Sequence, residues 1–427
     1  MIHKFSINGV NLLLDVHTGS LYELDDATYG LVGKNGLKEG NGEDYLKLRT
    51  LIEEGQLYSR DDYDNNYPNY RNNTPVKALC LHIAHDCNLR CGYCFADKGE
   101  YGGARALMSF ETAKKAIDFV VDHSAKRKNI EVDFFGGEPL MNFDVIRKTI
   151  KYAQTMGIIN DKVFRFTLTT NGVLLDNKKM KYINENMSNL VLSLDGRREI
   201  HDKMRKTING EGSYDVVVDK LVSAAKMRGE RDYYVRGTFT RDNLDFAKDV
   251  KHLAGLGFKN ISVEPVVGGQ TSDYSLKHED LPIIFDEYER LARDYVEDDY
   301  NFFHFMLTDE QPCAVKRIAG CGAGCEYIAV APNGDIYPCH QFVGREEFFM
   351  GSVADGELNR NISRRFAEVN VYSKPKCTEC WAKFYCSGGC HANAFAFSGE
   401  LDGVYEIGCE LQKKRIECML YVKSRRE

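Results

Sequence analysis

The alternation of strand and helix patterns that begins at Val76 constrains the fold of this chain more than any other feature. Apolar strand patterns occur at Leu79–Ala84, Ile130–Phe135, Phe164–Thr169, Leu190–Leu194, Tyr233–Thr240 and Asn260–Glu264. Between them lie amphipathic helical patterns at Ser109–His123, Phe143–Met156, Tyr214–Arg228 and Leu244–Leu256. This alternation predicts a parallel sheet with right-handed crossovers. Polar and glycine-rich segments follow nearly every strand, as at the active face of a β/α barrel, so we expect an α/β fold with a partial (β/α)6 barrel rather than an open doubly wound sheet.

The regions on either side of this alternation differ from it in composition. Short strands are predicted at Phe5–Val10, Asn11–Val16 and Ser20–Glu23, then helices near Asp25–Val32 and Glu43–Glu54, and Tyr58–Asn73 has the polar composition of a linker. Beyond Pro312 the chain is rich in glycine and holds ten of the 14 cysteines, so we expect this segment to fold around metal. At about 150 residues per domain, 427 residues suit two or three domains, and we expect 1–74, 75–310 and 311–427.

Charge and hydropathy exclude several classes of protein. The 56 basic and 63 acidic residues give a formal net charge of −7, which disfavours a general nucleic-acid binder. The chain contains no apolar run of about 18 residues, so a membrane span is not expected. The first residues, Met-Ile-His-Lys-Phe-Ser, lack the charged and apolar segments of a signal peptide. We therefore predict a cytoplasmic protein with neither a nucleic acid nor a membrane as partner.

The spacing of the cysteines indicates metal ligands rather than disulfides. Cys87, Cys91 and Cys94 form a C-x-x-x-C-x-x-C loop directly after the first barrel strand. In a reduced compartment, cysteines this close are typical of metal sites. Three thiolates can hold three corners of a [4Fe–4S] cluster and leave one iron open to a substrate or cofactor. The alternative is a structural zinc site with His85 or His82 as the fourth ligand.

This loop, including the aromatic Tyr93 before its last cysteine, resembles the signature of the radical S-adenosylmethionine (SAM) superfamily. The resemblance implies that Cys87, Cys91 and Cys94 bind the catalytic cluster and that its open iron chelates the amino and carboxylate groups of SAM. It also implies that an electron from the cluster cleaves SAM to methionine and a 5′-deoxyadenosyl radical. Such radical chemistry belongs to the cofactor, while the protein orients it.

Other strand ends agree with this resemblance. Gly136-Gly137-Glu138-Pro139 resembles the motif for the cofactor's amino group, since glycine permits close backbone approach and a carboxylate can accept from an ammonium. The resemblance places further cofactor contacts at the next strand ends, at Asn171, Ser193, Asp195 and Arg205. Ser193 and Asp195 are candidates for the ribose hydroxyls, and Arg205 for the carboxylate, which an arginine can bind in bidentate fashion. Each motif alone is common as a turn or a surface charge.

The spacing of the C-terminal cysteines resembles the SPASM extension of peptide-modifying radical enzymes. The resemblance implies one auxiliary [4Fe–4S] cluster on Cys377, Cys380, Cys386 and Cys409, and a second on Cys321, Cys339 and Cys390. With the first loop, the cofactors are SAM and three [4Fe–4S] clusters. The three-ligand cluster has room for a substrate thiolate unless Cys325 completes it. The alternative to these clusters is a pair of zinc knuckles, but zinc cannot carry electrons.

The N-terminal segment resembles the small winged-helix element that recognises leader peptides of ribosomally made, modified peptides. Such elements take the leader as an added strand at a sheet edge. Residues 1–60 hold six Lys/Arg and nine Asp/Glu, a net charge of −3, which disfavours a DNA-binding winged helix. A structural cap on the barrel is the remaining alternative.

Together these parts resemble the maturases of SCIFF peptides, six-cysteine precursors that receive thioether cross-links between a cysteine and a carbon of another residue. The resemblance implies a Cys-rich precursor peptide as substrate and an electron donor such as flavodoxin or ferredoxin. One alternative is an anaerobic sulfatase maturase. That family carries a catalytic aspartate directly after the second SPASM cysteine, where this chain has His340. A second alternative is a non-catalytic iron–sulfur electron carrier.

Overall fold

The computed structural model describes residues 1–63, 74–268, 272–306 and 313–426. Residues 64–73 of the expected linker lie outside this range. The chain forms two compact units, of which the first comprises Met1–Tyr70, Lys277–Gly320 and Val369–Glu427, and the second Arg71–Leu276 and Cys321–Glu368. The cysteine-rich segment is thus shared between the two units, whereas the sequence suggested one C-terminal domain. Within the described ranges, no helix is both long and apolar enough to cross a membrane.

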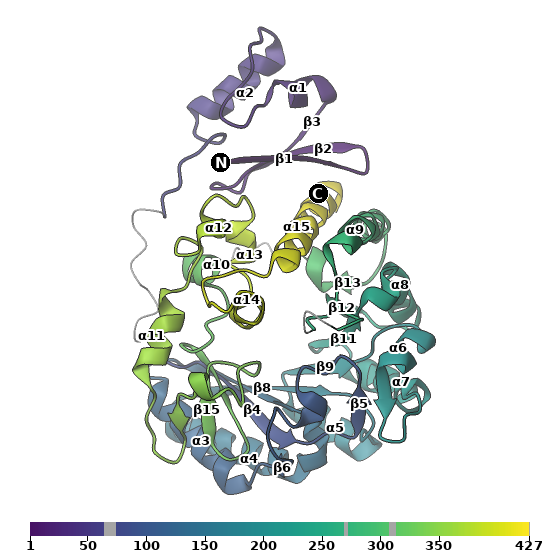
Figure 1. The fold of residues 1–427 in the computed structure, drawn as a ribbon, viewed down its shortest axis with the longest axis vertical. Coiled ribbons are helices and arrows are strands. Elements are labelled where there is room, and N and C mark those ends of the chain that lie inside the picture. The colour runs from purple at the N-terminus through teal and green to yellow at the C-terminus, as the bar shows by residue number, and fades with distance from the viewer. Residues whose placement is uncertain (64–73, 269–271, 307–312, 427) are drawn as a thin grey trace. The chain divides into compact units, whose positions relative to one another are not determined.

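The second unit is built on a sheet of six parallel strands, in the order β12-β11-β9-β8-β7-β4. Their bounds are β4 Ala78–His85, β7 Asn129–Gly136, β8 Val163–Thr170, β9 Asn189–Ser193, β11 Tyr233–Phe239 and β12 Asn260–Pro265. Each strand lies beside the next along the chain, without the reversal of order that defines a doubly wound sheet. All six predicted strands are confirmed, and their order is that of a partial barrel (Figure 1).

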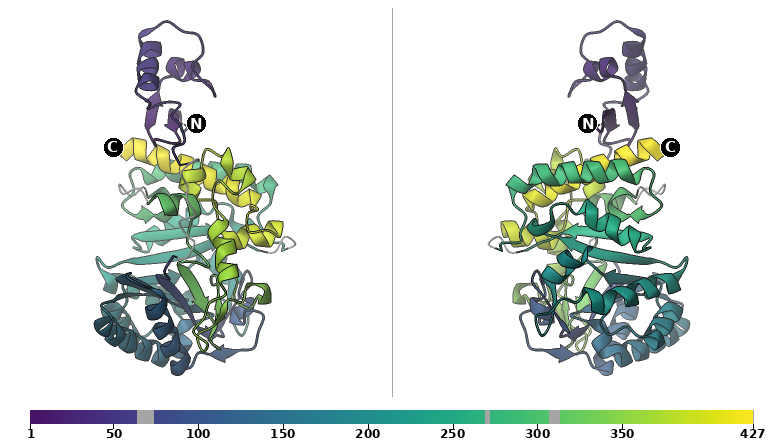
Figure 2. Two further views of the ribbon diagram at one scale, coloured as in Figure 1. Left: turned by 90° about the vertical axis from the view of Figure 1, so that its left-hand side faces the viewer. Right: turned by 90° about the vertical axis from the view of Figure 1, so that its right-hand side faces the viewer.

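Helices cover one face of this sheet. Their bounds are α3 Phe110–His123, α4 Phe143–Ile159, α5 Asn177–Asn186, α6 Arg198–Met204, α7 Tyr214–Arg228 and α8 Ala247–Gly255. α3 and α4 pack side by side, α3 against β4 and α4 against β8 (Figure 2). Ser109 begins α3 as its N-cap, since its hydroxyl accepts a hydrogen bond from the Thr112 amide. The strands and these helices bury their apolar side chains between them, which fixes the register of the strand ends that carry the site.

Part of the cysteine-rich segment extends this sheet, which the sequence did not predict. Strand β14 (Tyr327–Val330) pairs in parallel with β4, from Tyr327 opposite Ala78 to Val330 opposite Leu81. β15 (Asp335–Tyr337) and β16 (Gly351–Ser352) follow in antiparallel order, and α11 (Arg360–Glu368) completes the unit. Ile328, Ala329 and Val330 are fully buried, so this edge of the sheet gains stability from apolar burial.

The first unit begins with the predicted three-stranded sheet. Its antiparallel strands are β1 Ile2–Ile7, β2 Val10–Asp15 and β3 Leu21–Leu24, and the helices α1 Asp26–Leu31 and α2 Glu43–Glu53 follow. The buried side chains of Leu13, Val32, Leu48 and Leu57 form its apolar core. Both helices and the second and third strands occur where the sequence places them. β1 lies three residues before the predicted Phe5–Val10, because Asn8 and Gly9 form the turn to β2.

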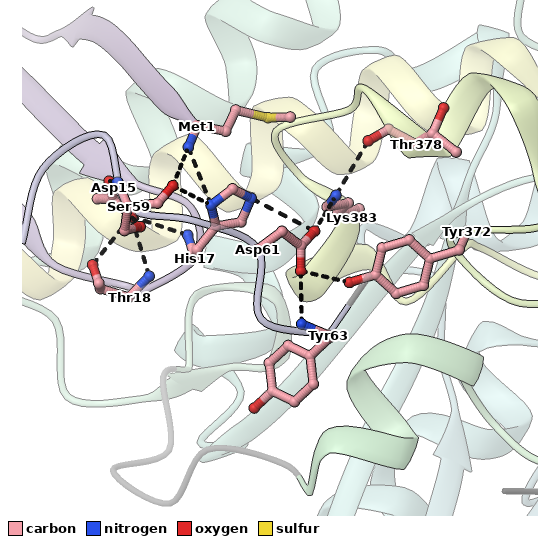
Figure 3. Close-up of polar contacts among 10 residues, drawn as sticks. All are labelled: Met1, Asp15, His17, Thr18, Ser59, Asp61, Tyr63, Tyr372, Thr378 and Lys383. Carbon is pink, nitrogen blue, oxygen red and sulfur yellow. Dashed lines mark hydrogen bonds and ion pairs between the residues drawn. The ribbon is translucent and has the colours of Figure 1, made fainter. Parts of the chain in front are cut away.

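The rest of this unit is mainly helical. The bounds are α9 Leu281–Tyr295, β13 Asn301–Phe302, α10 Ala314–Ala319, α12 Pro375–Thr378, α13 Lys383–Cys386, α14 His391–Ser398 and α15 Glu406–Arg426. α15 packs along α9 (Figure 1). The Asp61 carboxylate accepts hydrogen bonds from Lys383 Nζ at 2.8 Å and from the Tyr372 hydroxyl at 2.8 Å (Figure 3). This buried contact joins the chain that follows the three-stranded sheet to the cysteine-bearing helices.

Candidate active site

The Cys87–Cys94 loop follows β4 and is fixed by a second pair of strands. β5 (Leu89–Cys91) pairs antiparallel with β10 (Arg205–Thr207), with Cys91 opposite Arg205. The Gly92 amide continues the contact by donating to the Met204 carbonyl at 2.8 Å. All three cysteines of the loop line one cavity of about 260 Å³. The sequence predicted the loop but not this pairing, which places Arg205 at its edge.

The donor set of this loop suits an iron–sulfur cluster. Burial raises the pKa of Cys87 to about 12 and that of Cys91 to about 11, so the thiolates need a cationic centre beside them. Cys87 Sγ also accepts from the Leu89 amide at 3.4 Å and from Asn171 Nδ2 at 3.7 Å. Thiolates spread around a cavity fit a larger, multi-iron group better than one zinc ion.

The glycine pair at the end of β7 makes a close backbone approach. The Gly137 amide donates to the Ala84 carbonyl at 2.7 Å, and the Glu138 amide donates to the Asp86 carbonyl at 2.9 Å. A Cβ atom on Gly137 would overlap the Asp86 carbonyl oxygen, and Gly136 has a φ of +125°. Both glycines line the cavity. The backbone that approaches Gly137 so closely is therefore the start of the cysteine loop. The two glycines hold this loop against the end of β7.

Glu138 lines the cavity with a carboxylate that already has partners. Its Oε1 accepts from the Leu140 amide at 3.0 Å and from Thr170 Oγ1 at 2.8 Å, and its Oε2 accepts from the Asn171 amide at 2.8 Å. Burial raises its pKa to about 7 despite these donors. A carboxylate has about four acceptor positions, so Oε2 retains capacity for an ammonium. The proposed contact with the cofactor's amino group is compatible with this geometry.

Asn171, at the end of β8, acts on the cysteine loop. Its Nδ2 donates to Asn88 Oδ1 at 2.8 Å as well as to Cys87 Sγ, and its Oδ1 accepts from the Val173 amide at 3.1 Å. The side chain is 8% exposed and lines the cavity. Asn171 therefore orients the first cysteine of the loop in addition to facing the cofactor space.

Asp195 differs from the sequence-based expectation. Ser193 lines the cavity, whereas Asp195 is fully buried and does not belong to the lining. Its carboxylate accepts from the Tyr93 hydroxyl at 2.6 Å, from Arg205 Nε at 3.0 Å and from the Thr238 amide at 3.0 Å. With three donors in place, Asp195 holds Tyr93 and Arg205 rather than facing a ribose hydroxyl.

Arg205 is one of three cationic residues that line the cavity, together with Lys98 and Arg236, and it pairs with the cysteine loop itself. Its guanidinium lies over the Tyr93 ring, with 5.6 Å between the guanidinium carbon and the ring centre, and its Nε is occupied by Asp195. The backbone of Arg205 is held as well, because its carbonyl accepts from Ser213 Oγ at 2.6 Å. Ser213 in turn contacts His201 Nε2 at 2.9 Å. Arg205 is therefore positioned through side chain and backbone, and its location suits a carboxylate ligand.

The cavity has a further set of lining residues that the sequence did not single out as site residues. They are Phe95, Phe135, Arg236, Thr238, Glu264 and His340. The His340 ring packs against Phe135 at 5.0 Å and Phe95 at 5.8 Å between ring centres, and burial lowers its pKa to about 4. His340 could have been identified from the sequence by its place directly after Cys339. Arg236 and Glu264 could have been identified by the alternation of side-chain direction along β11 and β12.

In the first unit, four of the predicted auxiliary ligands lie near one another. The Cys386 thiol lies near Cys409, Cys377 and Cys380. Burial is the main cause that raises the pKa of Cys386 to about 12, and the three neighbouring cysteines add to it. Burial and the same neighbours raise the pKa of Cys409 to about 11. Of these four cysteines, Cys377 is buried and the others are partly buried. A group of neighbouring thiols that disfavour one another's ionisation fits an iron–sulfur cluster, whose irons compensate the thiolates.

The other auxiliary set stays a prediction. Cys321, Cys325 and Cys339 belong to the second unit and Cys390 to the first. Cys325 is buried, and its thiol lies 3.4 Å from the Ser363 carbonyl oxygen of α11. Cys80 and Cys418 are fully buried in β4 and α15, as expected of core residues.

Comparisons with known proteins agree with the geometry. Residues 81–239 match the radical SAM superfamily. The chain is 25% identical over 344 residues to a cysteine-type anaerobic sulfatase-maturating enzyme of Clostridium novyi, which covers 74% of this chain and 89% of that protein. It is 23% identical over 385 residues to the antilisterial bacteriocin subtilosin biosynthesis protein AlbA of Bacillus subtilis, over 86% of this chain and 75% of that protein.

A solved structure shows the same fold. Native anSMEcpe with bound AdoMet superposes with a TM-score of 0.66 and 21% identity, over 80% of this chain and 96% of that one. Residues 81–239 therefore form a radical SAM domain, and over most of its length the chain resembles proteins named for sulfatase maturation and for bacteriocin biosynthesis.

Proposed function

We propose that this chain forms intramolecular thioether cross-links between a cysteine and another residue of a ribosomally made, Cys-rich precursor peptide. One observation carries the proposal. The Cys87–Cys94 loop, the Gly136-Gly137-Glu138 motif and Arg205 meet around one cavity of about 260 Å³. The likeness to the subtilosin biosynthesis protein supports a peptide substrate, and the four-cysteine group of the first unit supports additional redox centres.

Specific residues of the cavity would hold the cofactors. Cys87, Cys91 and Cys94 would bind a [4Fe–4S] cluster, while Arg205 would bind the carboxylate of SAM, Glu138 its amino group and Ser193 its ribose. The bound cluster and SAM, reduced by a donor such as flavodoxin or ferredoxin, would supply the radical chemistry for removing a hydrogen atom from the substrate.

The residues around these groups orient them and limit access of water. Asp195 holds the Arg205 guanidinium from the Nε side, which leaves its terminal nitrogens for a carboxylate. The Leu89 and Asn171 N–H groups stabilise negative charge on Cys87 Sγ. Phe135 and the His340 ring form an apolar wall of the cavity, which keeps water from a reactive carbon radical.

The three-stranded sheet supports recognition of a leader peptide. β1 and β3 each pair with β2, and in the described part of the chain neither pairs with a further strand. His3 of β1 stacks on Trp381 at 3.6 Å between ring centres and contacts Glu417 at 3.0 Å. We therefore assign the leader to the β3 edge, as an added strand. Amide hydrogen exchange should slow in β3 and not in β1 when the leader peptide is added, and equal exchange rates would contradict the assignment.

A sulfatase-maturase-like oxidation of a peptide residue is the second candidate. The identity to the Clostridium novyi enzyme favours it, whereas His340 in place of the aspartate expected there disfavours it. The two reactions differ in product, since a thioether consumes the cysteine thiol and keeps its sulfur in the peptide.

Anaerobic incubation with a Cys-rich precursor, SAM and a reductant tests the proposal. We expect the peptide to lose two hydrogen atoms per cross-link and its linked cysteines to resist alkylation. An aldehyde product that traps hydrazine supports the second candidate instead. Absence of 5′-deoxyadenosine would identify an electron carrier rather than an enzyme. The chain with Cys87, Cys91 and Cys94 replaced by Ala is the matched control.

A further inference from the structure

Lys374 is a buried lysine within the four-cysteine group of the first unit. It is 1% exposed, and its Nζ donates to the Gly388 carbonyl at 2.9 Å and the Gly403 carbonyl at 3.1 Å. Its own carbonyl accepts from the Cys377 amide at 2.9 Å. One side chain thus connects the segment that carries Cys377, the turn after Cys386 and the segment before Cys409.

The ammonium of Lys374 has neutral hydrogen-bond acceptors, which makes its burial costly. Lys383, another buried lysine of this unit, shows the usual solution, because the Asp61 carboxylate accepts from it at 2.8 Å (Figure 3). Lys374 Nζ instead binds the Gly388 carbonyl, which lies two residues after Cys386 and two before Cys390. Burial lowers its pKa, while the thiolates of Cys377, Cys386, Cys409 and Cys390 act in the opposite direction and stabilise the ammonium. A buried charge needs compensation, and at this place the cysteines are its source.

We infer that Lys374 supplies the internal counter-charge of the iron–sulfur cluster on Cys377, Cys380, Cys386 and Cys409, and raises the reduction potential of that cluster. The inference rests on the cluster assigned under the proposed function. Reduction by an external donor adds one electron, and therefore one negative charge, without making or breaking a bond. A fixed positive charge in a medium of low dielectric constant stabilises the reduced form more than the oxidised form.

Three variants separate the charge of Lys374 from its hydrogen bonds. Lys374→Gln keeps N–H donors for the two carbonyls but removes the charge, and Lys374→Arg keeps both. Lys376→Gln is the matched control, because Lys376 lies two residues away, is 64% exposed at its side chain and pairs with Glu406 in solvent. Exposed charges are screened by water and salt, so this change should leave the potential unaffected.

The measurement is a redox titration of the full-length chain, anaerobically reconstituted with iron and sulfide and followed by electron paramagnetic resonance. The signal of this cluster is the one that Cys380→Ala removes. We expect Lys374→Gln to shift the midpoint potential of this cluster to a more negative value by at least about 59 mV. For one electron, that shift is a tenfold fall in the equilibrium constant for reduction. Lys374→Arg and Lys376→Gln should titrate like the unsubstituted chain.

Each other outcome decides the inference. A native potential in Lys374→Gln overturns it. Loss of the cluster in Lys374→Gln but not in Lys374→Arg supports it, since the charge is then needed to hold the thiolates. Loss of the cluster in both variants overturns it in favour of a packing role. If no signal of the unsubstituted chain depends on Cys380, the four-cysteine cluster itself is wrong, and the inference fails with it.

Discussion

The two cysteine regions that the structure assembles are held in different ways. The Cys87–Cys94 loop is fixed by strand pairing between β5 and β10 and by N–H groups of neighbouring strands, and its thiols line a cavity of about 260 Å³. The group of Cys377, Cys380, Cys386 and Cys409 is carried by helical turns and has a buried ammonium beside it. The first arrangement provides three thiols and space for a small molecule. The second provides four thiols and a buried lysine, which would suit the electron-transfer cluster that we propose.

The largest expected effect tests the role of the cysteine loop in the barrel. Replacing Cys87, Cys91 and Cys94 with Ala should remove about four irons per chain and abolish formation of 5′-deoxyadenosine, because the cofactor loses its iron. Replacing Cys409 with Ala should leave the iron of the barrel cluster in place and retain cofactor cleavage. Iron analysis and chromatography of the nucleoside products measure both. Cleavage of SAM by the triple variant would refute the assignment of the loop.

A smaller effect tests the buried charges of the helical region. Burial raises the pKa of Asp61, but the hydrogen bonds from Lys383 and Tyr372 outweigh it, so the pKa lies below its ordinary value. Asp61→Asn leaves the buried Lys383 ammonium without a carboxylate and should cost about 2 kcal/mol locally. Amide exchange in residues 372–386 should become roughly thirtyfold faster, by the same free energy.

The pH dependence of this variant follows from the lowered pKa. A carboxyl whose pKa is lower in the folded state stabilises the fold above its unfolded pKa of about 3.9 and loses that effect as the pH falls through the folded value. The difference between Asp61→Asn and the unsubstituted chain should therefore begin to shrink below about pH 4 and disappear only as the pH falls through the lower folded pKa of Asp61. Asp44→Asn is the control, because the ion pair of Asp44 with Lys47 is exposed and contributes little. Equal exchange rates at neutral pH would show that Asp61 is dispensable.

The sequence predicted those parts of the molecule in which local pattern and chemistry coincide. All six barrel strands are apolar runs that alternate with helices, and the cysteine loop follows the first of them. The strand order and the cavity follow from this, since parallel strands present their ends at one edge. The glycine pair predicted a close backbone approach to the cofactor, whereas the contact that requires glycine at Gly137 is with the Asp86 carbonyl of the cysteine loop.

Features that depend on distant segments were not predictable from local pattern. β14 is a short apolar run in a glycine-rich stretch, and only its pairing with β4 makes it a strand. Asp195 follows a strand, as do other residues that we propose as cofactor contacts, yet its carboxylate accepts hydrogen bonds from Tyr93 and Arg205 and does not line the cavity. The packing of β14 on the barrel also explains why 321–368 separates from the rest of the cysteine-rich segment.

The next effect sharpens the barrel side of the comparison, where Asp195 acts through Arg205. Asp195→Asn removes the charge that fixes the guanidinium, so the carboxylate of SAM should bind about tenfold more weakly, or about 1.4 kcal/mol. Equilibrium binding of SAM to the reconstituted protein measures this, while the iron content should not change. Asp245→Asn is the control. Asp245 pairs with Arg197, which follows β9 as Asp195 does, but Asp245 does not line the cavity. An unchanged affinity in Asp195→Asn would mean that Arg205 does not bind the carboxylate.

The smallest effect isolates one hydroxyl of the same network. Tyr93→Phe keeps the ring under the Arg205 guanidinium and removes only the 2.6 Å hydrogen bond to Asp195, leaving that carboxylate with two donors. One hydrogen bond contributes about 0.5–1.5 kcal/mol, and because its effect reaches SAM only through Arg205, we expect roughly threefold weaker binding. Tyr152→Phe is a matched control, since the Tyr152 hydroxyl also donates to a carboxylate, that of Asp118, but between the outer helices α4 and α3. Combining Tyr93→Phe with Asp195→Asn should add little to the Asp195→Asn effect, because both changes act on the same guanidinium. If the two losses multiply instead, Tyr93 contacts the cofactor directly and does not act through Asp195.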